Sequence, residues 1–402
     1  MTKVKVINPI VELDGDEMAH VMWAWIKESL ILPYLDINLL YYDLGLPNRD
    51  ATDDKVTAEA AEAIKLHHVG VKCAAINPDE ARVKEYGLKK AWRSPNAQVR
   101  ETIGGTLFRE PVICRNIPCR VPGWKKPIIV ARHAFADEFA AADFLVPGPG
   151  TVSLCFKPRG GGAAIEQKVF EFPGPGITLG MYNLDDSIAG FARASMAYGL
   201  DAGYPVYLGT KNTALKAYDN RFKEIFQQIY EDEFKSRFEA KGIFYEHRLV
   251  DELAGFVIKS SGGFVYACRN RDGDIQSDMV AEGFGSLGLM ASILMTPDGC
   301  TIQTEAAHGT ITRHYRQYQQ GRETSTNPTA SIIAWARALG FRGRFDTVPE
   351  LCAFAKALEA ACIETIESGI MTRDLAVLIN PSQAWVTTRQ FINTVDKRLR
   401  GS

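Results

Sequence analysis

Apolar and polar positions follow strand and helix periods from the beginning of the chain. Residues 4–11 and 38–42 alternate as strands do, and residues 18–30 and 57–66 carry apolar side chains at helical spacing. Residues 69–76 predict another buried strand. Strands that alternate with helices in this way predict an α/β fold, with a mostly parallel sheet covered by helices on both faces.

The rest of the chain continues this pattern with one exception. Further strands are predicted at 127–132, 206–208, 244–249 and 301–305, helices at 185–197, 217–240 and 251–259, and a mainly helical end from residue 330. The exception is residues 147–176, where Gly and Pro separate two short strand-like runs, 152–156 and 168–172. This segment alternates too regularly for a flexible linker, and it predicts hairpins that protrude or pair with a partner chain.

Composition narrows the possible functions. A net charge of −2 over 402 residues gives no electrostatic support for nucleic-acid or anionic-membrane binding. No apolar run reaches the ~18–20 residues of a membrane-spanning helix, and the first residues enter a strand pattern without the regions of a signal peptide. The eight cysteines form no C-x-x-C pair, so free, buried thiols are expected. We therefore expect a cytoplasmic protein with no membrane or nucleic-acid partner.

Two acidic residues define the first candidate site. Asp274 and Asp278 are four residues apart, so a helix that opens at Asp274 would place both carboxylates on one face, roughly 5–6 Å apart at Cβ. A hard divalent cation such as Mg²⁺ or Mn²⁺ takes oxygen ligands and suits this spacing. The same residues could instead be a solvated helix start whose acids offset the helix dipole. Both interpretations are open at this point.

Three arginines far from this pair favour an anionic ligand. Arg100, Arg109 and Arg132 lie at or near the ends of predicted elements, and Ser94 is close to the first of them in sequence. Arginine binds carboxylates in a bidentate fork, so the grouping suits a small polyanion.

Residues 283–288 match the G-x-G-x-x-G pattern of dinucleotide-binding proteins. A Rossmann motif needs a strand before these glycines, and here the preceding segment is the predicted metal helix. We therefore predict tight packing or a loop beside the site, and no Rossmann domain.

Motifs along the whole chain resemble one family of dehydrogenases. The motifs are ELDGDE from Glu12, WRSPN from Trp92, FRE from Phe108, RHA from Arg132, YNLD from Tyr182, TKNT from Thr210, YEHRL from Tyr245, the segment 274–278, and EAAHGT from Glu305. Together they are similar to the NADP-dependent isocitrate dehydrogenases of the homodimeric subfamily.

This resemblance implies an isocitrate dehydrogenase-like α/β fold without a Rossmann motif. Residues 1–103 and 285–402 are expected to form a large domain, and residues 104–136 and 186–284 a small domain. Residues 137–185 are expected to form a clasp that joins two subunits of a homodimer with shared active sites.

The resemblance also implies roles for individual residues. Substrate contacts are expected from Asn77, Ser94, Arg100, Arg109, Arg132 and Phe139. Metal ligands are expected at Asp274 and Asp278 of one subunit with Asp251 of the other, and catalytic roles at Asp274 and at Lys211, which is donated across the dimer. NADP contacts are expected from Lys72, Asn96, Lys259, His308, Gly309, Thr310, Arg313, His314 and Asn327. Among these, Arg313 and His314, with Lys259 from the other subunit, would bind the 2′-phosphate and favour NADP over NAD.

The implied reaction is the oxidative decarboxylation of a small tricarboxylate-like 2-hydroxy acid, with NADP and Mg²⁺ or Mn²⁺. The metal lowers the pKa of the substrate hydroxyl and polarises the ketone that forms when hydride leaves. The β-carboxylate then leaves as CO₂, and a general acid protonates the resulting enol.

Four departures from the family's pattern cluster, by sequence, around the substrate and cofactor. Phe139 stands where the family has a tyrosine acid, and Ala140 replaces the arginine that follows it. The family's Thr-Ile-Thr is represented by Ala75, Ile76 and Asn77, and its Gly-Thr by Ala97 and Gln98. Because the arginines, metal ligands and Lys211 are retained, the departures predict a change of substrate.

Three hypotheses follow. The main one is a dehydrogenase for a 3-substituted malate that is an isocitrate analogue, for example a phosphonomethyl-malate of a phosphonate pathway. The alternative is ordinary isocitrate dehydrogenation to 2-oxoglutarate and CO₂, which would require a substitute for the tyrosine acid. A third is a catalytically silent dimer that binds ligand as a sensor or scaffold.

Overall fold

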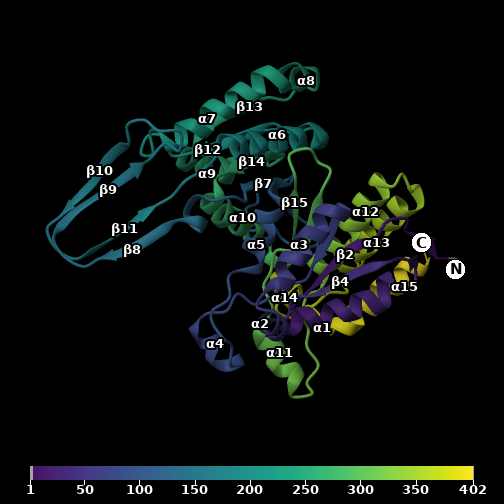
Figure 1. Ribbon diagram of the computed structural model, residues 1–402. Helices are drawn as coiled ribbons and strands as arrows, with labels where there is room; N and C mark the ends of the chain where they lie inside the picture. The colour runs from purple at the N-terminus through teal and green to yellow at the C-terminus, as the bar shows by residue number, and fades with distance from the viewer. Residues whose placement is uncertain (1–2, 402) are drawn as a thin grey trace.

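The computed structural model describes residues 3–401 and is organised around one ten-stranded sheet (Figure 1). In spatial order its strands are Tyr245–Leu249 (β13), Val206–Thr210 (β12), Phe264–Cys268 (β14), Ile128–His133 (β7), Thr106–Pro111 (β6), Met290–Met295 (β15), Ile302–Ala306 (β16), Val69–Lys72 (β5), Ile10–Asp14 (β2) and Leu39–Asp43 (β4). Neighbours are parallel except at β7–β6, β6–β15 and β15–β16. The predicted α/β class with a mostly parallel sheet is confirmed.

Hydrophobic clusters cover both halves of this sheet, and the two largest lie on different halves. On the half from β15 to β4, the helices Glu17–Ile26 (α1), Thr329–Phe345 (α12), Pro349–Glu367 (α13) and Thr388–Gly401 (α15) contribute buried side chains, including the paired rings of Trp23 and Trp335. On the other half, Asp185–Ala202 (α6) and Tyr218–Ile229 (α7) bury aromatic side chains against β12 and β14. The strands of the two halves come from the segments predicted as large and small domain, but nothing in the structure tests that division. Because one sheet runs through both, the domain boundaries themselves stay a prediction.

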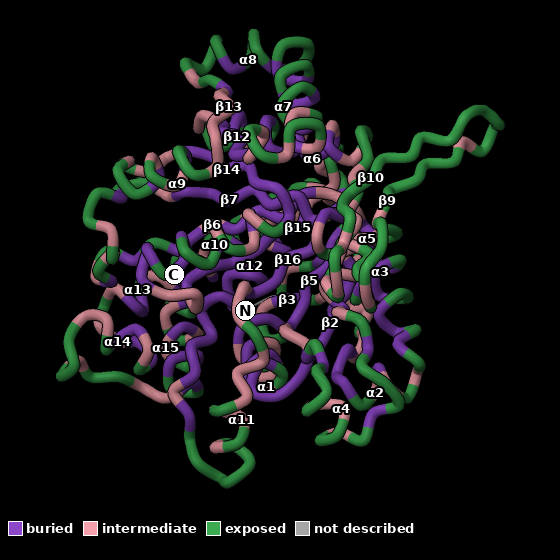
Figure 2. The backbone as a smooth tube through the Cα atoms, turned by 90° about the vertical axis from the view of Figure 1, so that its left-hand side faces the viewer, coloured by how far each residue is buried: buried purple, intermediate pink, exposed green. Residues whose placement is uncertain are grey.

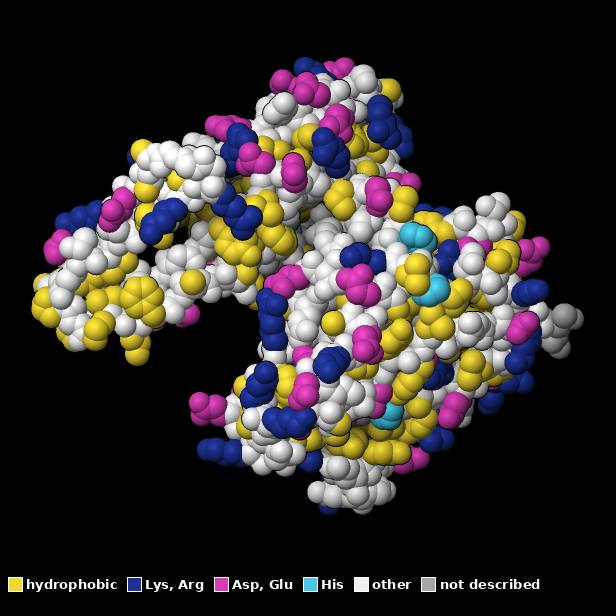
Figure 3. All heavy atoms as spheres, in the orientation of Figure 1, with side chains coloured by type: hydrophobic (Ala, Val, Ile, Leu, Met, Phe, Trp, Pro, Cys, Tyr) yellow, Lys and Arg dark blue, Asp and Glu magenta, His cyan; other side chains and the backbone are white. Residues whose placement is uncertain are grey.

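Four strands leave this body as a protruding arm (Figures 1 and 2). Ala142–Val146 (β8) pairs with Gly176–Gly180 (β11), and Gly150–Phe156 (β9) pairs with Ile165–Phe172 (β10), both antiparallel. The predicted hairpins in this Gly- and Pro-rich segment are confirmed. The arm exposes large apolar side chains, among them Phe144, Leu145, Leu154 and Phe156 (Figure 3), which is the composition expected of a surface that another chain covers.

The helix that carries the acidic pair begins earlier than predicted. Helix α10 spans Asn270–Phe284 with Arg269 as its N-cap residue, so the expected opening at Asp274 is wrong. Gly273 lies in its first turn, where an added Cβ would come within 2.7 Å of the Arg132 side chain. Packing of this first helical turn against β7 therefore favours a helix, even though the sequence of the segment is typical of a loop turn. Gly285, at φ +131°, ends the helix, and no strand precedes the glycine-rich residues, which confirms the rejection of a Rossmann motif.

The remaining helices connect and cover these elements. They are Leu46–Ala51 (α2), Lys55–His67 (α3), Glu80–Tyr86 (α4), Pro95–Ile103 (α5), Lys235–Ala240 (α8), Val250–Lys259 (α9), Thr312–Gln319 (α11) and Arg373–Ile379 (α14), with a short separate pair of strands at Val4–Lys5 (β1) and Leu35–Asp36 (β3). Among residues 3–401 no helix combines the length and apolarity needed to cross a membrane. All eight cysteines are free thiols as predicted, but only four are buried, because Cys119 and Cys352 are partly exposed and Cys155 and Cys300 are exposed.

Candidate active site

The substrate arginines and the metal carboxylates predicted from the sequence meet where β6, β7 and α10 pack together. Arg109 Nη1 donates to Asp278 Oδ1 at 2.7 Å and to Ser277 Oγ at 2.7 Å. Arg132 Nη1 forms an ion pair with Asp274 Oδ1, and Arg109 Nη2 lies 3.7 Å from the same oxygen. Both carboxylates thus bond to buried arginines although they are partly exposed, and their role as metal ligands stays a prediction.

Arg100 enters the same site from α5 and binds an acid to which the sequence analysis assigned no role. Its Nη2 donates to Glu305 Oε1 at 2.9 Å, and Glu305 Oε2 lies 3.6 Å from Lys72 Nζ. Burial alone would raise the pKa of Glu305, but Arg100 and Lys72 outweigh it and lower that pKa to about 2. The only sequence signal for Glu305 was its position in the EAAHGT motif at the end of β16.

Cations exceed carboxylates in this site. Burial, followed by repulsion from Arg100, lowers the pKa of Arg132 to about 9, and burial also lowers the pKa of Arg109. The cations Arg100, Arg109, Arg132 and Lys72 outnumber the carboxylates Asp274, Asp278 and Glu305 by one. A divalent cation together with a trianionic substrate would remove that surplus, so the site fits this pair of ligands electrostatically.

The acidic pair offers the oxygen donors that Mg²⁺ or Mn²⁺ prefers. The side chains of Asp274 and Asp278 are 41% and 56% exposed and follow one another by one helical turn on α10. Residues 3–401 of one chain contain no group of three or more His, Cys, Asp or Glu side chains positioned to hold a metal. The assignment of Asp251 of another subunit as a further ligand stays a prediction.

Lys211 and Asp251 lie together at the surface, away from the acidic pair. Lys211 follows β12, and its Nζ donates to Asp251 Oδ1 at 2.6 Å, which lowers the pKa of this carboxyl. The two side chains are 42% and 60% exposed. This arrangement matches the prediction that both serve a neighbouring subunit, and that role also stays a prediction.

Two of the predicted cofactor residues carry polar atoms that lack a partner. His308 Nε2 and Asn96 Oδ1 are both buried and accept or donate no hydrogen bond within the described residues. Buried polar atoms are normally paired, so these atoms fit a site completed by a polar ligand such as a nicotinamide dinucleotide.

The other predicted cofactor residues differ in accessibility. Arg313, Lys259 and Gly309 are exposed, whereas Lys72 is only 1% exposed and donates to the carbonyl of Cys73. His314 hydrogen-bonds to Thr326, Asn327 donates to Asp374, and Thr310 donates to Glu17. The contacts of these residues with NADP remain predictions.

Phe139 lies beside Arg132, one of the predicted substrate residues, whereas Gln98 bonds elsewhere, and contacts of Phe139 and Asn77 with substrate stay predictions. Phe139 is half exposed, and its ring centre is 4.7 Å from the Arg132 guanidinium carbon. Asn77 is exposed, beyond the end of β5. Gln98 Nε2 instead donates to Asp54 Oδ2 at 2.5 Å. Gln98 therefore bonds to one member of a buried ion pair. Its difference from the family's pattern gives no evidence for a different substrate.

Ser94 has a local structural role. It is the N-cap residue of α5, and its Oγ accepts a long bond of 3.5 Å from the Ala97 backbone N–H. The cap fixes the start of the helix whose last turn carries Arg100. A direct contact between Ser94 and substrate stays a prediction.

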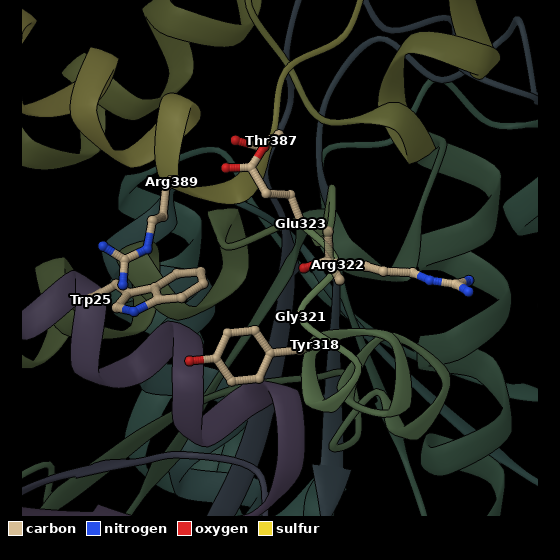
Figure 4. Close-up of a pocket in the computed structure, with 8 residues that line it drawn as sticks. Trp25, Tyr318, Gly321, Arg322, Glu323, Thr387 and Arg389 are labelled. Atoms are coloured by element: carbon tan, nitrogen blue, oxygen red, sulfur yellow. The ribbon is translucent and has the colours of Figure 1, made fainter.

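A separate small cavity lies between α1, the segment after α11 and the start of α15 (Figure 4). Its volume is about 150 Å³, and Trp25, Tyr318 and Arg389 line it, with the Arg389 guanidinium carbon 4.3 Å from the Trp25 ring centre. None of the predicted site residues lines this cavity. In Figure 3 the outline of the molecule is indented below the protruding arm, with charged side chains along the edge of the indentation.

Comparisons with known proteins cover nearly the whole chain. The family described as "Isocitrate/isopropylmalate dehydrogenase" matches residues 5–395. "Isocitrate dehydrogenase [NADP]" of Sphingobium yanoikuyae is 58% identical over 98% of this chain and 97% of its own. "Isocitrate dehydrogenase [NADP] 1" of Mycobacterium tuberculosis is 58% identical over 99% and 97%, and the mitochondrial "Isocitrate dehydrogenase [NADP]" of Mus musculus is 55% identical over 98% and 87%. The resemblance found in the motifs is confirmed, and the chain belongs to the isocitrate/isopropylmalate dehydrogenase family of enzymes.

Proposed function

We propose that this protein is an NADP-dependent dehydrogenase that oxidatively decarboxylates isocitrate to 2-oxoglutarate and CO₂. The observation that carries the proposal is the junction of Arg109 and Arg132 with Asp278 and Asp274, together with the neighbouring ion pair of Arg100 and Glu305. The names of the relatives support isocitrate, the alternative hypothesis of the sequence analysis, better than the phosphonomethyl analogue that was the main one.

The arginines bind and orient the carboxylates of the substrate. Arg109 and Arg132 emerge from adjacent strands and are almost fully buried, so their positions are set by the sheet before substrate arrives. Bound Mg²⁺ or Mn²⁺, held by Asp274 and Asp278, would supply Lewis acidity at the substrate hydroxyl. Since these carboxylates now bond to Arg109 and Arg132, ligand binding must exchange some of those ion pairs for bonds to metal and substrate.

The proposed reaction needs proton transfer at two places, the substrate hydroxyl and the enol. Lys211 is proposed to act near the substrate hydroxyl of the neighbouring subunit, because its amine is exposed and already bonded to an acid. Phe139 cannot donate a proton, so protonation of the enol requires a different donor from the family's tyrosine. This requirement is the main chemical difference between this chain and the family's pattern.

NADP is the cofactor in the names of all three relatives described. In this chain Arg313 is exposed at the first turn of α11, with His314 beside it. A guanidinium and an imidazole supply the charge and donors that a 2′-phosphate needs. A homodimer is proposed because Lys211 and Asp251 lie outside the metal site of their own chain.

Isocitrate activity is tested by measuring NADPH and CO₂ together. With isocitrate, NADP⁺ and Mn²⁺, we expect one NADPH and one CO₂ for each isocitrate consumed, and no product after EDTA treatment until Mn²⁺ is restored. NADPH without CO₂ would contradict the decarboxylating reaction, and metal-independent turnover would contradict the role of the acidic pair. Turnover of any substrate would exclude the catalytically silent dimer.

A second candidate, a 3-substituted malate that is not isocitrate, is favoured by one observation. Phe139 and Asn77 both differ from the family's pattern at predicted substrate positions, and Asn77 offers two donors and an acceptor where threonine has one hydroxyl. An amide of this kind suits a distal group with more oxygens than a carboxylate, such as a phosphonate. Comparing kcat/KM for isocitrate and (phosphonomethyl)malate decides between the candidates, because the second requires the phosphonate to be preferred.

The cytoplasmic location stays a prediction. Relatives of similar identity include proteins named mitochondrial and peroxisomal. Family membership is therefore compatible with several compartments.

A further inference from the structure

Arg269 is a buried cation surrounded by four carboxylates. It is 4% exposed and caps α10. Its Nε lies 3.1 Å from Asp219 Oδ1, its Nη1 lies 3.9 Å from Asp137 Oδ2, and its Nη2 lies 3.6 Å from Glu138 Oε1 and 3.9 Å from Asp272 Oδ2. No role was assigned to Arg269 from the sequence.

One side of this cluster leads to a substrate arginine. The backbone N–H of Asn270 donates to Asp137 Oδ2 at 3.2 Å, and Asn270 Oδ1 accepts from Arg132 Nε at 2.8 Å. Asp137, Asn270 and Arg132 are all buried. The orientation of the Arg132 guanidinium therefore depends on Asn270, which is bonded to Asp137, and Asp137 is also the carboxylate that Arg269 approaches.

The opposite side leads to Lys211. Asp219 is fully buried, and while one of its oxygens faces Arg269, the other accepts from the Lys211 backbone N–H at 2.6 Å. The Lys211 side chain then extends to Asp251 at the surface. Arg269 thus lies between the residue that holds substrate in one site and the residue proposed to serve the other site.

The same cluster holds the segment that carries Phe139. Ala136 and Asp137 have φ values of +49° and +54°, which are unfavourable for residues other than glycine. Asp137 Oδ1 accepts from Tyr218 Oη at 2.6 Å and from Asn183 Nδ2 at 2.9 Å. These bonds, with the cation of Arg269, keep the strained turn in place two residues before Phe139.

A stabilising role alone is a poor explanation for this arrangement. One guanidinium faces four acids, and burial raises the pKa of Asp219. Buried ion pairs of this kind are often no more stabilising than apolar side chains of the same volume. What the cluster provides is a defined geometry for the elements that meet there.

We propose that Arg269 is a positioning residue that fixes, within one chain, Arg132 of one substrate site and Lys211 of the other. It contacts neither residue directly and acts through Asp137 and Asn270 on one side and through Asp219 on the other. The inference deepens the proposed function and rests on the shared-site dimer.

The test uses dimers that contain a single working site. A chain with Asp274→Asn is paired with a differently tagged chain with Lys211→Met, and the heterodimer is purified through both tags. The one intact site then takes Arg132 from the Lys211→Met chain and Lys211 from the Asp274→Asn chain. Arg269→Gln is introduced into one chain at a time.

The two placements should have different kinetic effects. In the chain that donates Lys211, Arg269→Gln should lower kcat for isocitrate roughly 10- to 100-fold with little change in KM. In the chain that donates Arg132, it should mainly raise KM. Arg269→Lys keeps the charge and should restore most of the lost activity in both placements. If Arg269 had only a structural role, the change in kcat and the change in KM would not depend on which chain carries the substitution.

Three results would overturn the inference, and they are distinguishable. Equal effects in both placements, or a drop in melting temperature without a kinetic change, would make Arg269 structural only. If the Arg269→Gln dimer does not fold, Asp219→Asn in each chain replaces it, and an effect that does not depend on the chain is again contradictory. An inactive parent heterodimer would refute the shared site itself. Arg193→Gln, at an exposed ion pair with Glu233, is the matched control.

Discussion

The two parts of the proposed active site differ in how completely one chain forms them. Arg109 and Arg132 are 7% and 3% exposed and bond to the acids of α10. Lys211 and Asp251 are 42% and 60% exposed, and their side-chain termini bond to each other. The first part is ordered by the sheet, whereas the second is an ion pair at the surface.

This difference indicates which functions each part can perform alone. A buried arginine fork is already in position to bind a polyanion, so the single chain provides affinity and orientation. In the proposed dimer, the exposed lysine would supply chemistry only when a second chain places it over that fork. Changes in the buried part should therefore alter binding and metal retention, and changes in the exposed part should alter the rate of the chemical step.

Asp278→Asn should have the largest effect on the buried part. It removes a carboxylate charge from the proposed metal site, and we expect kcat/KM for isocitrate to fall by at least roughly 10²–10³-fold. The stabilisation of the folded dimer by Mn²⁺, measured as a shift in melting temperature, should also disappear. Glu282→Gln, an exposed acid on the same helix, is the control and should change neither quantity. An Asp278→Asn protein that Mn²⁺ stabilises as in the parent would contradict the assignment.

Phe139→Tyr combined with Asn77→Thr tests whether the missing acid limits turnover of isocitrate. Loss of a general acid typically costs 10²–10⁴-fold, so restoring the phenol should raise kcat/KM for isocitrate, by up to roughly 10²-fold. Phe139→Leu removes the ring over Arg132 without adding an acid, and it should give no gain. An unchanged rate in the double variant would show that another proton donor already operates.

Arg313→Gln tests the predicted contact between Arg313 and the 2′-phosphate of NADP. A charged hydrogen bond to the 2′-phosphate is worth about 1.5–3 kcal/mol, so kcat/KM for NADP⁺ should fall about 10- to 100-fold. The value for NAD⁺, which lacks that phosphate, should hardly change. Arg322→Gln, on the exposed loop after α11, is the control. A similar loss with both cofactors would remove Arg313 from phosphate recognition.

His133 gives the smallest predicted effect, which concerns the pH dependence of stability and is absent at neutral pH. Burial lowers its pKa in the folded protein to about 3, against about 6.5 for an unfolded chain. Between these values the unfolded state binds the extra proton, so this contribution to stability falls as the pH decreases from about 6.5 towards 3. From pH 6.5 to 5 the loss is about 2 kcal/mol at 1.36 kcal/mol per pH unit.

His133→Gln should remove that part of the pH dependence. Urea unfolding of the parent and the variant at pH 7 and pH 5 measures it, with His68→Gln, an exposed histidine, as the control. A parent whose stability changes with pH no more than that of His133→Gln would show that His133 is protonated normally in the fold.

The sequence predicted the elements that local periodicity defines and the pairing of residues that share one helix turn. Asp274 and Asp278 could be assigned to one face because their separation alone determines it. The start of α10 could not be placed correctly, since it depends on Gly273 packing against Arg132, which is distant in sequence.

The other contacts that the sequence did not predict join residues that are far apart in the sequence. Gln98 bonds to Asp54 and Glu305 bonds to Arg100, over separations of 44 and 205 residues. No local pattern reports such contacts. Resemblance could supply expected roles for site residues, but it could not show that Gln98 faces a buried ion pair instead of the substrate.

The central claim, that one active site needs residues from two chains, is tested most directly by complementation. A Lys211→Met homodimer and an Asp274→Asn homodimer should each be nearly inactive with isocitrate. A heterodimer purified through two different tags should recover activity, approaching half that of the parent dimer, because one of its two sites retains every required residue. Two chains that stay inactive in a verified, folded heterodimer would contradict a shared site, and so would full activity of either homodimer.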